Sequence, residues 1–596
     1  MILQSLHQLY ERLSAETDSG ISPPGYGKAK VSFALVLSKD GELVNVVPLW
    51  AEKGKRLVLT EMEVPHHPGR QGTKAPAYFL CDNSGYVLGI DAKGKREHSL
   101  QTFAAFRLLH QTVMGDSRDE GLLAVSRFLD KWDPSQAAWQ EKIYPHCEEL
   151  VAGGNLVFRV DGERDYVHEQ AAARQQWERH CCRQSSGASG QCLVTGHRLP
   201  IADVHPIIRG VRDAQTTGAA LVSFNKKSFC SYGKDQDFNA PVSQSAAFAY
   251  TTALNHLLAR RGQKLQIGDA TTVFWTQSSS PVEGLLEAFF NPPHELTERD
   301  LARGGRPRYD AKTTQLIHDI LERARDAKPV AGLAEYLDPD VRCFVLGLSP
   351  NNARLAVRFW HVATLGSLTR HLGQHYGDLA IERQYAHDPE FIPIWRILTE
   401  LCPLWDMANL PKTIESSLIR SIVVGGDYPL ALRGMLITRI QADHTINYVR
   451  AALVKACLLR AARRQGKTLP EASMTLNVES LNPGYRLGRL FAALEKAQHD
   501  ANGGELSSGI KDRYFGPASA TPAAVFPVLM RLAQHYIAKA QHGSNSDERI
   551  EDILTGVTHF PQLLCQDDQG LFILGYYHQR NAFYHKDEGD RKRSDA

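Results

Sequence analysis

The sequence predicts an α+β protein: a mixed, strand-containing N-terminal region followed by a predominantly α-helical C-terminal bundle. Before about residue 361, short runs rich in apolar and β-branched residues alternate with tight-turn signals. Beyond about residue 362, apolar residues recur at spacings of three and four, the period of an amphipathic helix. At 596 residues the chain is too long for one hydrophobic core, so several domains are expected.

The N-terminal region should open with a helix and continue with a hairpin. The apolar residues at helical spacing are Ile2, Leu6, Leu9, Tyr10 and Leu13. Two strand-like runs, 31–37 and 43–49, then flank Asp40-Gly41. This dipeptide suits a tight type I′ turn, so the runs predict an antiparallel hairpin.

A second hairpin is predicted between residues 341–348 and 354–360, joined through Ser349-Pro350-Asn351-Asn352. Strand alternation places Arg354 and Arg358 on one face. The other face receives Leu355, Val357 and Phe359. Two guanidinium groups on one face suit a nucleic-acid backbone, but a solvated face explains them equally well.

The C-terminal part carries three apolar stripes that predict helices of a bundle. They are Leu487, Leu490, Phe491 and Leu494, then Phe526, Leu529, Met530 and Ala533, then Ile550, Ile553, Leu554 and Val557. The helix breaker Asn482-Pro483-Gly484 precedes the first stripe. We therefore predict three parts: a mixed region 1–361, a helical connecting region 362–473 and a terminal bundle 474–596.

The charge balance excludes a polycation. Lys and Arg number 68 against 66 Asp and Glu, a formal net charge of +2, so any nucleic-acid surface must be local. No apolar run approaches the span of a bilayer, and the start at Met1 has no secretory signal pattern. Ten cysteines without regular spacing suggest reduced thiols. We expect a cytoplasmic protein that has no membrane partner.

Sequence motifs favour binding over catalysis. The chain has no GxSxG elbow, no GxxxxGK[ST] loop and no strand-linked GxGxxG, so no enzyme activity and no cofactor are predicted. Cys181, Cys182, Cys192 and His197 contain zinc-ligand types, but two CxxC-like pairs are missing and adjacent cysteines rarely bind one metal. A dispersed carboxylate nuclease site would leave no motif and stays an alternative.

Residues 192–254 are the most informative stretch, because Gly, Asn, Ser, Thr, Lys and Arg crowd into turns between short apolar segments. Glycines let a backbone approach a ligand closely, amides and hydroxyls bind phosphate oxygens, and nearby cations supply charge. The segments include Cys192-Leu193-Val194-Thr195-Gly196, His205-Pro206-Ile207-Ile208-Arg209-Gly210-Val211, Gln215-Thr216-Thr217-Gly218, Ser223-Phe224-Asn225-Lys226-Lys227, Ser231-Tyr232-Gly233-Lys234 and Asn239-Ala240-Pro241. Composition alone also fits ordinary loops.

In their order and amino-acid content, these segments resemble the sequence of the large subunit of the type I-C CRISPR interference complex (Cascade), the Csd-type family. Similar segments occur towards both ends of the chain, so the resemblance covers essentially all of it. They include Met1-Ile2-Leu3-Gln4, Phe79-Leu80-Cys81-Asp82-Asn83, Leu487-Gly488-Arg489-Leu490-Phe491, Ile510-Lys511-Asp512-Arg513-Tyr514-Phe515 and Gly575-Tyr576-Tyr577-His578-Gln579-Arg580. No single segment is a fingerprint, and the specificity lies in the ordered set.

The resemblance implies a non-catalytic subunit that recognises the protospacer-adjacent motif in duplex DNA, promotes unwinding, stabilises the R-loop and helps recruit the helicase-nuclease. The implied partners are CRISPR RNA, double-stranded target DNA with its displaced strand, the Cascade backbone and handle-binding subunits, small-subunit copies and the helicase-nuclease. The terminal bundle is similar to the small subunit, for which Met474 is a candidate internal start. A scaffold without motif reading and a metal-dependent nuclease are the alternatives.

The candidate site residues fall into three groups. In the loop 65–76 and just after it, Arg70, Gln71, Lys74 and Asn83 are candidate readers of the DNA motif, since Arg and Gln suit base edges. Candidates for the nucleic-acid backbone or a wedge are Arg209, Arg212, Gln215, Thr216, Thr217, Gly218, Asn225, Lys226, Lys227, Lys234 and Asn239. Candidates for the R-loop strand are Arg354, Arg358, Lys511, Arg513 and Arg580. Tyr576 and Phe583 are expected to be packing residues.

Overall fold

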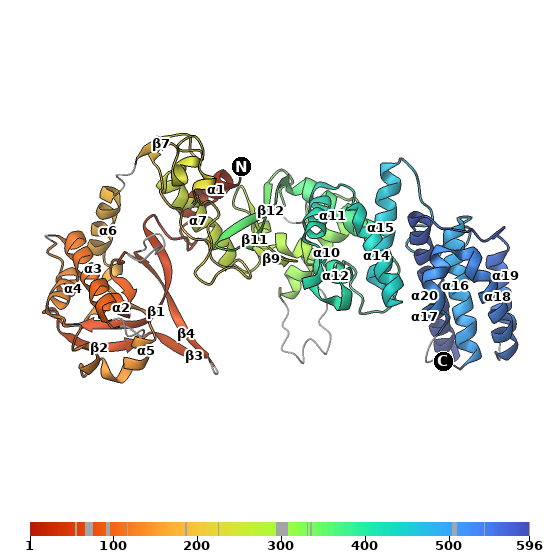
Figure 1. Ribbon diagram of the computed structural model, residues 1–596, viewed down its shortest axis with the longest axis horizontal. Helices are drawn as coiled ribbons and strands as arrows, with labels where there is room; N and C mark the ends of the chain where they lie inside the picture. Colours follow the sequence, from red (N-terminus) through yellow and green to blue (C-terminus); the bar gives the residue numbers. More distant parts are fainter. Residues whose placement is uncertain are drawn as a thin grey trace. The chain divides into compact units, whose positions relative to one another are not determined.

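The chain forms two compact units. The computed structural model describes residues 1–53, 56–65, 76–90, 96–115, 117–184, 188–224, 226–293, 308–330, 332–333, 337–503, 509–540 and 543–594. Unit 1 comprises Met1–Ala259 and Pro350–Ala356, and unit 2 comprises Arg260–Ser349 and Val357–Ala596. Every described strand ends by Thr364, and helices follow, which confirms the α+β class (Figure 1). The three predicted parts, 1–361, 362–473 and 474–596, stay a prediction.

Unit 1 is built on a six-stranded sheet of order β3-β4-β1-β6-β5, with β2 also paired to β1. The strands are β1 (Tyr26–Leu37), β2 (Leu43–Pro48), β3 (Trp50–Lys53), β4 (Arg56–Pro65), β5 (Cys81–Asn83) and β6 (Asn155–Val160). The short α2 (Ser84–Val87) and the longer α3 (Arg96–Met114), α4 (Glu120–Lys131) and α6 (Ala171–Gln184) lie by this sheet (Figure 1). Strand β1 is buried from Val31 to Leu37 because it runs through the core.

The predicted opening helix is confirmed as α1 (Ile2–Ala15). It buries Leu6, Leu9, Tyr10 and Leu13 and packs on α7 (Gln244–Ala259). The Tyr10 ring meets the Phe248 ring edge-on with centroids 5.7 Å apart. The first helix of the chain therefore supports the last helix of the same unit.

The first hairpin is confirmed, but its turn is not type I′. A type I′ turn needs positive φ at both central residues, and in this connection only Gly41 has one, at +83°. The Gly41 N–H donates to Ser38 O at 2.9 Å, which closes the turn. Strand β1 ends at Leu37, and β2 begins at Leu43. A Cβ on Gly41 would lie 2.6 Å from Arg127 Cβ, because the turn packs against α4. Glycine at position 41 therefore meets two requirements, the positive φ of the turn and the close approach of α4.

The second hairpin is also confirmed and is longer than predicted. Strands β11 (Arg342–Asn351) and β12 (Arg354–Thr364) are neighbours in the sheet β12-β11-β10-β9, with β10 (Ala270–Thr276) and β9 (Lys264–Ile267). Only Asn352 and Ala353 connect them, and Asn352 has a φ of +55°. The predicted apolar face is not uniformly covered: Leu355 and Phe359 are buried, but Val357 is 43% exposed.

Helices make up the rest of unit 2. They include α8 (Leu286–Phe290), α10 (Ala311–Arg325), α11 (Leu365–Leu379), α12 (Ile394–Thr399), α13 (Lys412–Val424), α14 (Leu430–Asp443), α15 (Tyr448–Arg464), α16 (Pro483–Ala501), α17 (Ile510–Ala520), α18 (Pro522–Lys539), α19 (Gly543–Leu554) and α20 (Gln566–Ser594). The three apolar stripes fall on α16, α18 and α19, as predicted, although Val557 lies beyond α19. Among the described helices, none is both long and apolar enough to span a bilayer.

Candidate nucleic-acid interface

The 208–219 loop of unit 1 is closed at its base by its own backbone. The Ile208 N–H donates to Ala219 O at 3.0 Å, and the Ala219 N–H donates back to Ile208 O at 2.9 Å. Within it, the Gly218 N–H donates to Gln215 O at 2.8 Å, which forms a turn. Gly218 has a φ of +102°, and a Cβ there would lie 2.8 Å from Ile208 O. Glycine is therefore required, and the turn holds Gln215, Thr216 and Thr217 at the surface.

Asn255 of helix α7 anchors the backbone of this loop. The Asn255 carboxamide accepts the Arg209 N–H at 2.8 Å and donates to Ile207 O at 3.1 Å. Nearby, the buried His205 Nδ1 lies 2.6 Å from Tyr250 Oη. Burial lowers the pKa of His205 to about 4, so this histidine is neutral near pH 7. Anchoring the backbone leaves the Arg209 side chain exposed.

The 226–239 loop is organised by the carboxamide of Asn239. Its Oδ1 accepts the Ser231 N–H at 2.8 Å, and its Nδ2 donates to Lys234 O at 3.1 Å and Gln236 O at 2.8 Å. Lys226, Lys227 and Lys234 are exposed on this loop. Within the described part of the chain, none of the three has a carboxylate partner. These ammonium groups are available to an anionic ligand.

The tip of the second hairpin, residues 350–356, joins the two loops within unit 1. The Ala220 N–H donates to Ala353 O at 3.0 Å, and the Leu355 N–H donates to Ala220 O at 2.9 Å. The Arg354 guanidinium lies over the Phe229 ring, 4.3 Å from its centroid. Ala220 directly follows the first loop and Phe229 belongs to the second, so residues more than a hundred positions away complete the interface. We call the two loops and this tip the loop interface.

The loop interface gathers most of the predicted backbone-binding residues. It contains Arg209, Arg212, Gln215, Thr216, Thr217, Gly218, Lys226, Lys227, Lys234, Asn239 and Arg354. Two of them have partners that limit their use: Arg212 lies 3.6 Å from the Asp213 carboxylate, and the Asn239 carboxamide is committed to its own loop. Asn225 lies outside the described residues.

Other predicted residues lie elsewhere. Arg358 belongs to unit 2 and forms a 2.8 Å ion pair with Asp269. Asn83 caps α2, since its Oδ1 accepts the Tyr86 N–H at 3.3 Å. The predicted motif readers Arg70, Gln71 and Lys74 lie outside the described residues.

In the terminal bundle, two of the predicted cations belong to an internal cluster. Lys511 Nζ lies 5.5 Å from the centroid of the buried Tyr576 ring, and Tyr576 Oη donates to Glu495 at 2.6 Å. Burial lowers the pKa of Lys511. The guanidinium of the partly buried Arg580 lies 5.4 Å from the centroid of the Tyr584 ring, whereas Arg513 is exposed. Tyr576 and Phe583 are buried, as predicted for packing residues.

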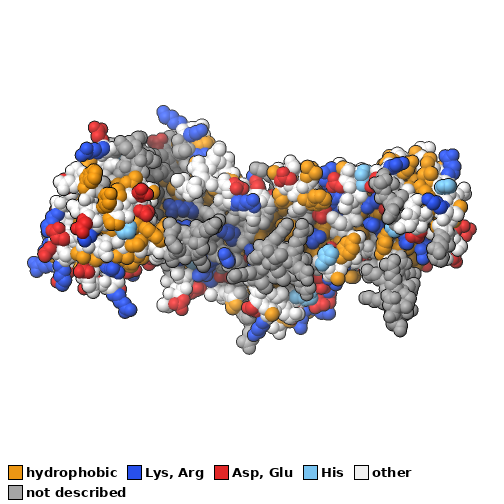
Figure 2. All heavy atoms as spheres, turned by 90° about the horizontal axis from the view of Figure 1, so that it is seen from below, with side chains coloured by type: hydrophobic (Ala, Val, Ile, Leu, Met, Phe, Trp, Pro, Cys, Tyr) orange, Lys and Arg blue, Asp and Glu red, His pale blue; other side chains and the backbone are white. Residues whose placement is uncertain are grey.

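Two aromatic residues of the loop interface were missed from the sequence as site residues. Tyr232 is 98% exposed and Phe229 is 39% exposed, although both are large and partly apolar. The available signal was their position among lysines, in Lys226-Lys227-Ser228-Phe229 and Ser231-Tyr232-Gly233-Lys234. Elsewhere, basic and acidic side chains are mixed over the visible described surface (Figure 2). This mixture agrees with a local interface on a nearly neutral protein.

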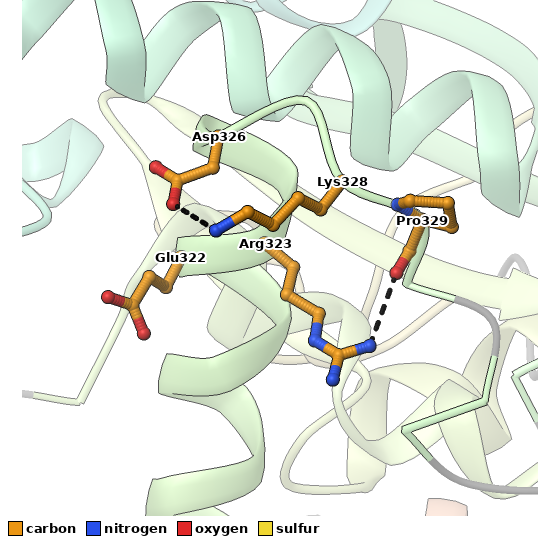
Figure 3. Close-up of a pocket in the computed structure, with 5 residues that line it drawn as sticks. All are labelled: Glu322, Arg323, Asp326, Lys328 and Pro329. Atoms are coloured by element: carbon orange, nitrogen blue, oxygen red, sulfur yellow. Dashed lines mark hydrogen bonds and ion pairs between the residues drawn. The ribbon is translucent and has the colours of Figure 1, made fainter.

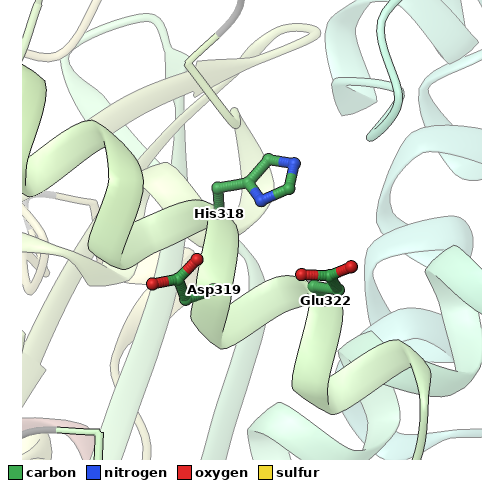
Figure 4. Close-up of side chains that lie close together, drawn as sticks. All are labelled: His318, Asp319 and Glu322. Carbon is green, nitrogen blue, oxygen red and sulfur yellow. The ribbon is translucent and has the colours of Figure 1, made fainter.

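Unit 2 has a surface hollow and a cluster of metal-capable residues, and polar groups in both have protein partners, although His318 Nδ1 is buried without one among the described residues. In the hollow at the end of α10, Lys328 Nζ lies 3.1 Å from Asp326, and Arg323 donates to Pro329 O at 3.5 Å (Figure 3). On the same helix, His318, Asp319 and Glu322 have ligand atoms within 4.8 Å of one another (Figure 4). His318 Nε2 lies 3.1 Å from Glu390, and Asp319 accepts from Gln315 at 2.7 Å. We assign no ligand to either feature.

The buried thiol of Cys192 is engaged in hydrogen bonds. Its Sγ accepts the Ser243 N–H at 3.2 Å and the Val194 N–H at 3.4 Å. Burial would raise the pKa of this thiol, but hydrogen bonds from Ser243 and Thr195 lower it to about 7. Among the described residues, Cys192 and His197 are not part of a metal-capable cluster. The thiol helps to join the 192–197 turn to the start of α7.

Comparison with models of protein families gives a match over nearly the whole chain. The model of the family described as CRISPR-associated protein (Cas_Csd1) matches residues 6–584. No curated protein matches the chain significantly. The family match spans both units and includes all three segments of the loop interface. The chain therefore belongs to the Cas_Csd1 family of CRISPR-associated proteins, which confirms the resemblance to the Csd-type family predicted from its sequence.

Proposed function

We propose that this chain is the non-catalytic large subunit of a type I-C RNA-guided surveillance complex. In this role it recognises the protospacer-adjacent motif in duplex DNA, helps to open the duplex, stabilises the R-loop and helps to recruit the helicase-nuclease. The family match over residues 6–584 carries the proposal. The proposed partners are CRISPR RNA, target DNA and the other Cascade subunits, in the cytoplasm.

The loop interface supplies the physical support. Its lysines form no ion pair in the described structure, although Asp235 and Asp237 lie on the same loop, and its hydroxyl-bearing turn at Gln215–Gly218 is closed by a backbone hydrogen bond and lies at the surface. Lys side chains, hydroxyls and backbone amides are the groups that bind phosphate oxygens. We assign the loop interface to the DNA backbone next to the opened base pairs, with the Gln215–Gly218 turn as the wedge.

Motif reading is assigned to Arg70, Gln71 and Lys74. Arg and Gln have the donor geometry that guanine and adenine edges require in the major groove, and Lys adds a donor and charge. Asn83 follows this loop, and its Oδ1 is used to cap α2. In this proposal Asn83 positions the end of the loop.

The test is selection of the sequence flanking the target. The guide-loaded complex is assembled with and without this chain, and binding is measured to duplex targets with a randomised flank at one fixed salt concentration. A short flank motif should be enriched only when the chain is present. Replacing Arg70, Gln71 and Lys74 together by Ala should remove the enrichment. The matched control replaces Gln140, Lys142 and Arg164, residues of the same three types elsewhere in unit 1.

The alternatives predict other results. A scaffold subunit would restore complex assembly while the flank stayed random, which would contradict motif reading. A nuclease would cleave DNA as the isolated chain with magnesium or manganese, which would contradict the non-catalytic role.

A further inference from the structure

Tyr232 has an unusual conformation for so exposed a side chain. The Lys234 N–H donates to Ser231 O at 3.1 Å, and the two central residues of this turn, Tyr232 and Gly233, have φ of +54° and +66°. This is the left-handed region, which suits Gly but is uncommon for Tyr. Since Tyr232 is 98% exposed, packing of its ring does not compensate the backbone strain.

The protein nevertheless holds this turn firmly. Asn239 binds three backbone groups across it, those of Ser231, Lys234 and Gln236. Three residues before Tyr232, the Phe229 ring carries the guanidinium of Arg354 on one face. The ring of Tyr232 is therefore presented to solvent from a pre-organised loop.

The loop that carries the ring has a formal charge of +1, since it holds three lysines against Asp235 and Asp237. Lys226, Lys227 and Lys234 are exposed on the same loop, and Lys234 is two residues from Tyr232. A docking site for a protein would be expected to place apolar side chains around an exposed aromatic residue. An aromatic ring among cations instead matches the way proteins hold unpaired strands, with bases stacked on rings and phosphates on Lys or Arg.

We propose that Tyr232 stacks on an unpaired nucleobase of a strand whose phosphates bind Lys226, Lys227 and Lys234. The inference rests on the proposed function, because it requires nucleic acid at the loop interface. It adds the chemical class of the ligand and the residue that contacts it. The base belongs to DNA or RNA, and its chemistry is the same in both.

The test measures binding of the full-length chain to short labelled strands of DNA, of RNA of the same sequence, and of duplex DNA. Tyr232→Ala should weaken binding of a single strand by about 5- to 100-fold, the range for loss of one stacked base, and leave duplex binding unchanged. Tyr232→Phe should bind as the wild type does, because stacking needs only the ring. The DNA or RNA arm that shows the loss identifies the strand.

Three controls separate stacking from folding and from charge. Tyr144→Ala removes another tyrosine of unit 1 that is 67% exposed and should change nothing. Tyr232→Asn places a residue that tolerates positive φ in the turn and should lose binding as Tyr232→Ala does. The salt dependence of binding should stay the same for all three Tyr232 variants, since no cation is removed.

Unchanged single-strand binding by Tyr232→Ala would overturn the inference. So would a Tyr232→Phe variant as weak as Tyr232→Ala, since the hydroxyl would then be the contact, or an equal loss on duplex DNA. These outcomes are separable from failure of the proposed function, which is judged by flank selection in the assembled complex. If the selected flank stays random while Tyr232→Ala still weakens single-strand binding, motif reading is rejected and the stacking inference stands.

Discussion

His110 shows how a single buried residue supports the segment that follows the predicted motif loop. Its Nδ1 lies 2.8 Å from Phe106 O, and its Nε2 lies 3.0 Å from the Leu80 nitrogen. The Leu80 N–H can only donate to Nε2, so His110 is neutral with its proton on Nδ1. Burial lowers the pKa of His110 to about 4. Leu80 has a φ of +55°, and this hydrogen bond stabilises that conformation.

We predict that unit 1 loses stability in acid. Between pH 6.5 and about 4 the unfolded chain protonates His110 and the folded chain does not, so the free energy of unfolding falls as the pH falls. The loss for this group approaches roughly 3 kcal/mol at the acid end. His168 and His205, with pKa values lowered by burial to about 4, act in the same direction.

Thermal unfolding measured between pH 7 and pH 4 tests this prediction. His110→Phe should be less stable at pH 7 but should show a weaker pH dependence than the wild type. The exposed His535 provides the control, and His535→Gln should keep the full dependence. An unaltered slope in His110→Phe would contradict the assignment.

In unit 2, Glu415 has a pKa raised by burial to about 7, so its contribution to stability falls as the pH rises from 4.5 to 7.

At the scale of elements, α16 and α20 cross closely because both carry glycine at the crossing. A Cβ on Gly488 of α16 would overlap the carbonyl oxygen of Phe572, and a Cβ on Gly575 of α20 would overlap the carbonyl oxygen of Tyr485. The overlapped atoms are backbone, so no side-chain rotation relieves them. The apolar stripe of α16 predicted its buried face, and these glycines set how near α20 lies.

We predict that Gly488→Ala destabilises unit 2 by about 1–3 kcal/mol, the usual cost of forcing extra volume into a packed core. Chemical denaturation followed by circular dichroism measures it. Gly434 is the matched control, because it lies in α14 and a Cβ built on it would meet only Gln566 Nε2, at an ordinary contact distance of 3.8 Å. Gly434→Ala should be neutral or slightly stabilising, since Ala is the better helix former. Equal stability of the two variants would show that the helices separate without cost.

At the scale of the molecule, binding of a polyanion must depend on where charges lie. The net charge of +2 gives little long-range attraction, whereas the loop interface concentrates lysines without acidic partners in the described structure. Salt sensitivity should therefore arise from a few residues.

We predict that replacing Lys226, Lys227 and Lys234 by Ala lowers the slope of log affinity for a single strand against log salt by up to about 2, because each lysine bound to a single-strand phosphate contributes roughly 0.7 to that slope. Fluorescence anisotropy over a salt series measures the slope. The control replaces three exposed lysines outside the loop interface, Lys142, Lys312 and Lys467, and should leave the slope unchanged. Equal effects in both variants would place the phosphate-binding residues elsewhere.

Local patterns along the chain were enough to predict the α+β class, both hairpins, the amphipathic helices and the family. These features depend on side-chain periodicity, turn residues and segment order, which are properties of neighbouring positions in the chain. The sequence also marked most residues of the loop interface, because they lie within one stretch, 192–254.

The contacts between distant segments are seen in the folded structure alone. The fold brings Arg354 to Phe229, buries Lys511 and Arg580 partly within the terminal bundle, pairs Arg358 with Asp269, and replaces the expected type I′ turn at Gly41. Each outcome depends on interactions between residues far apart in sequence, whose geometry a local pattern does not contain. The exposure and backbone conformation of Tyr232 belong to the same class, because they follow from how Asn239 folds the loop.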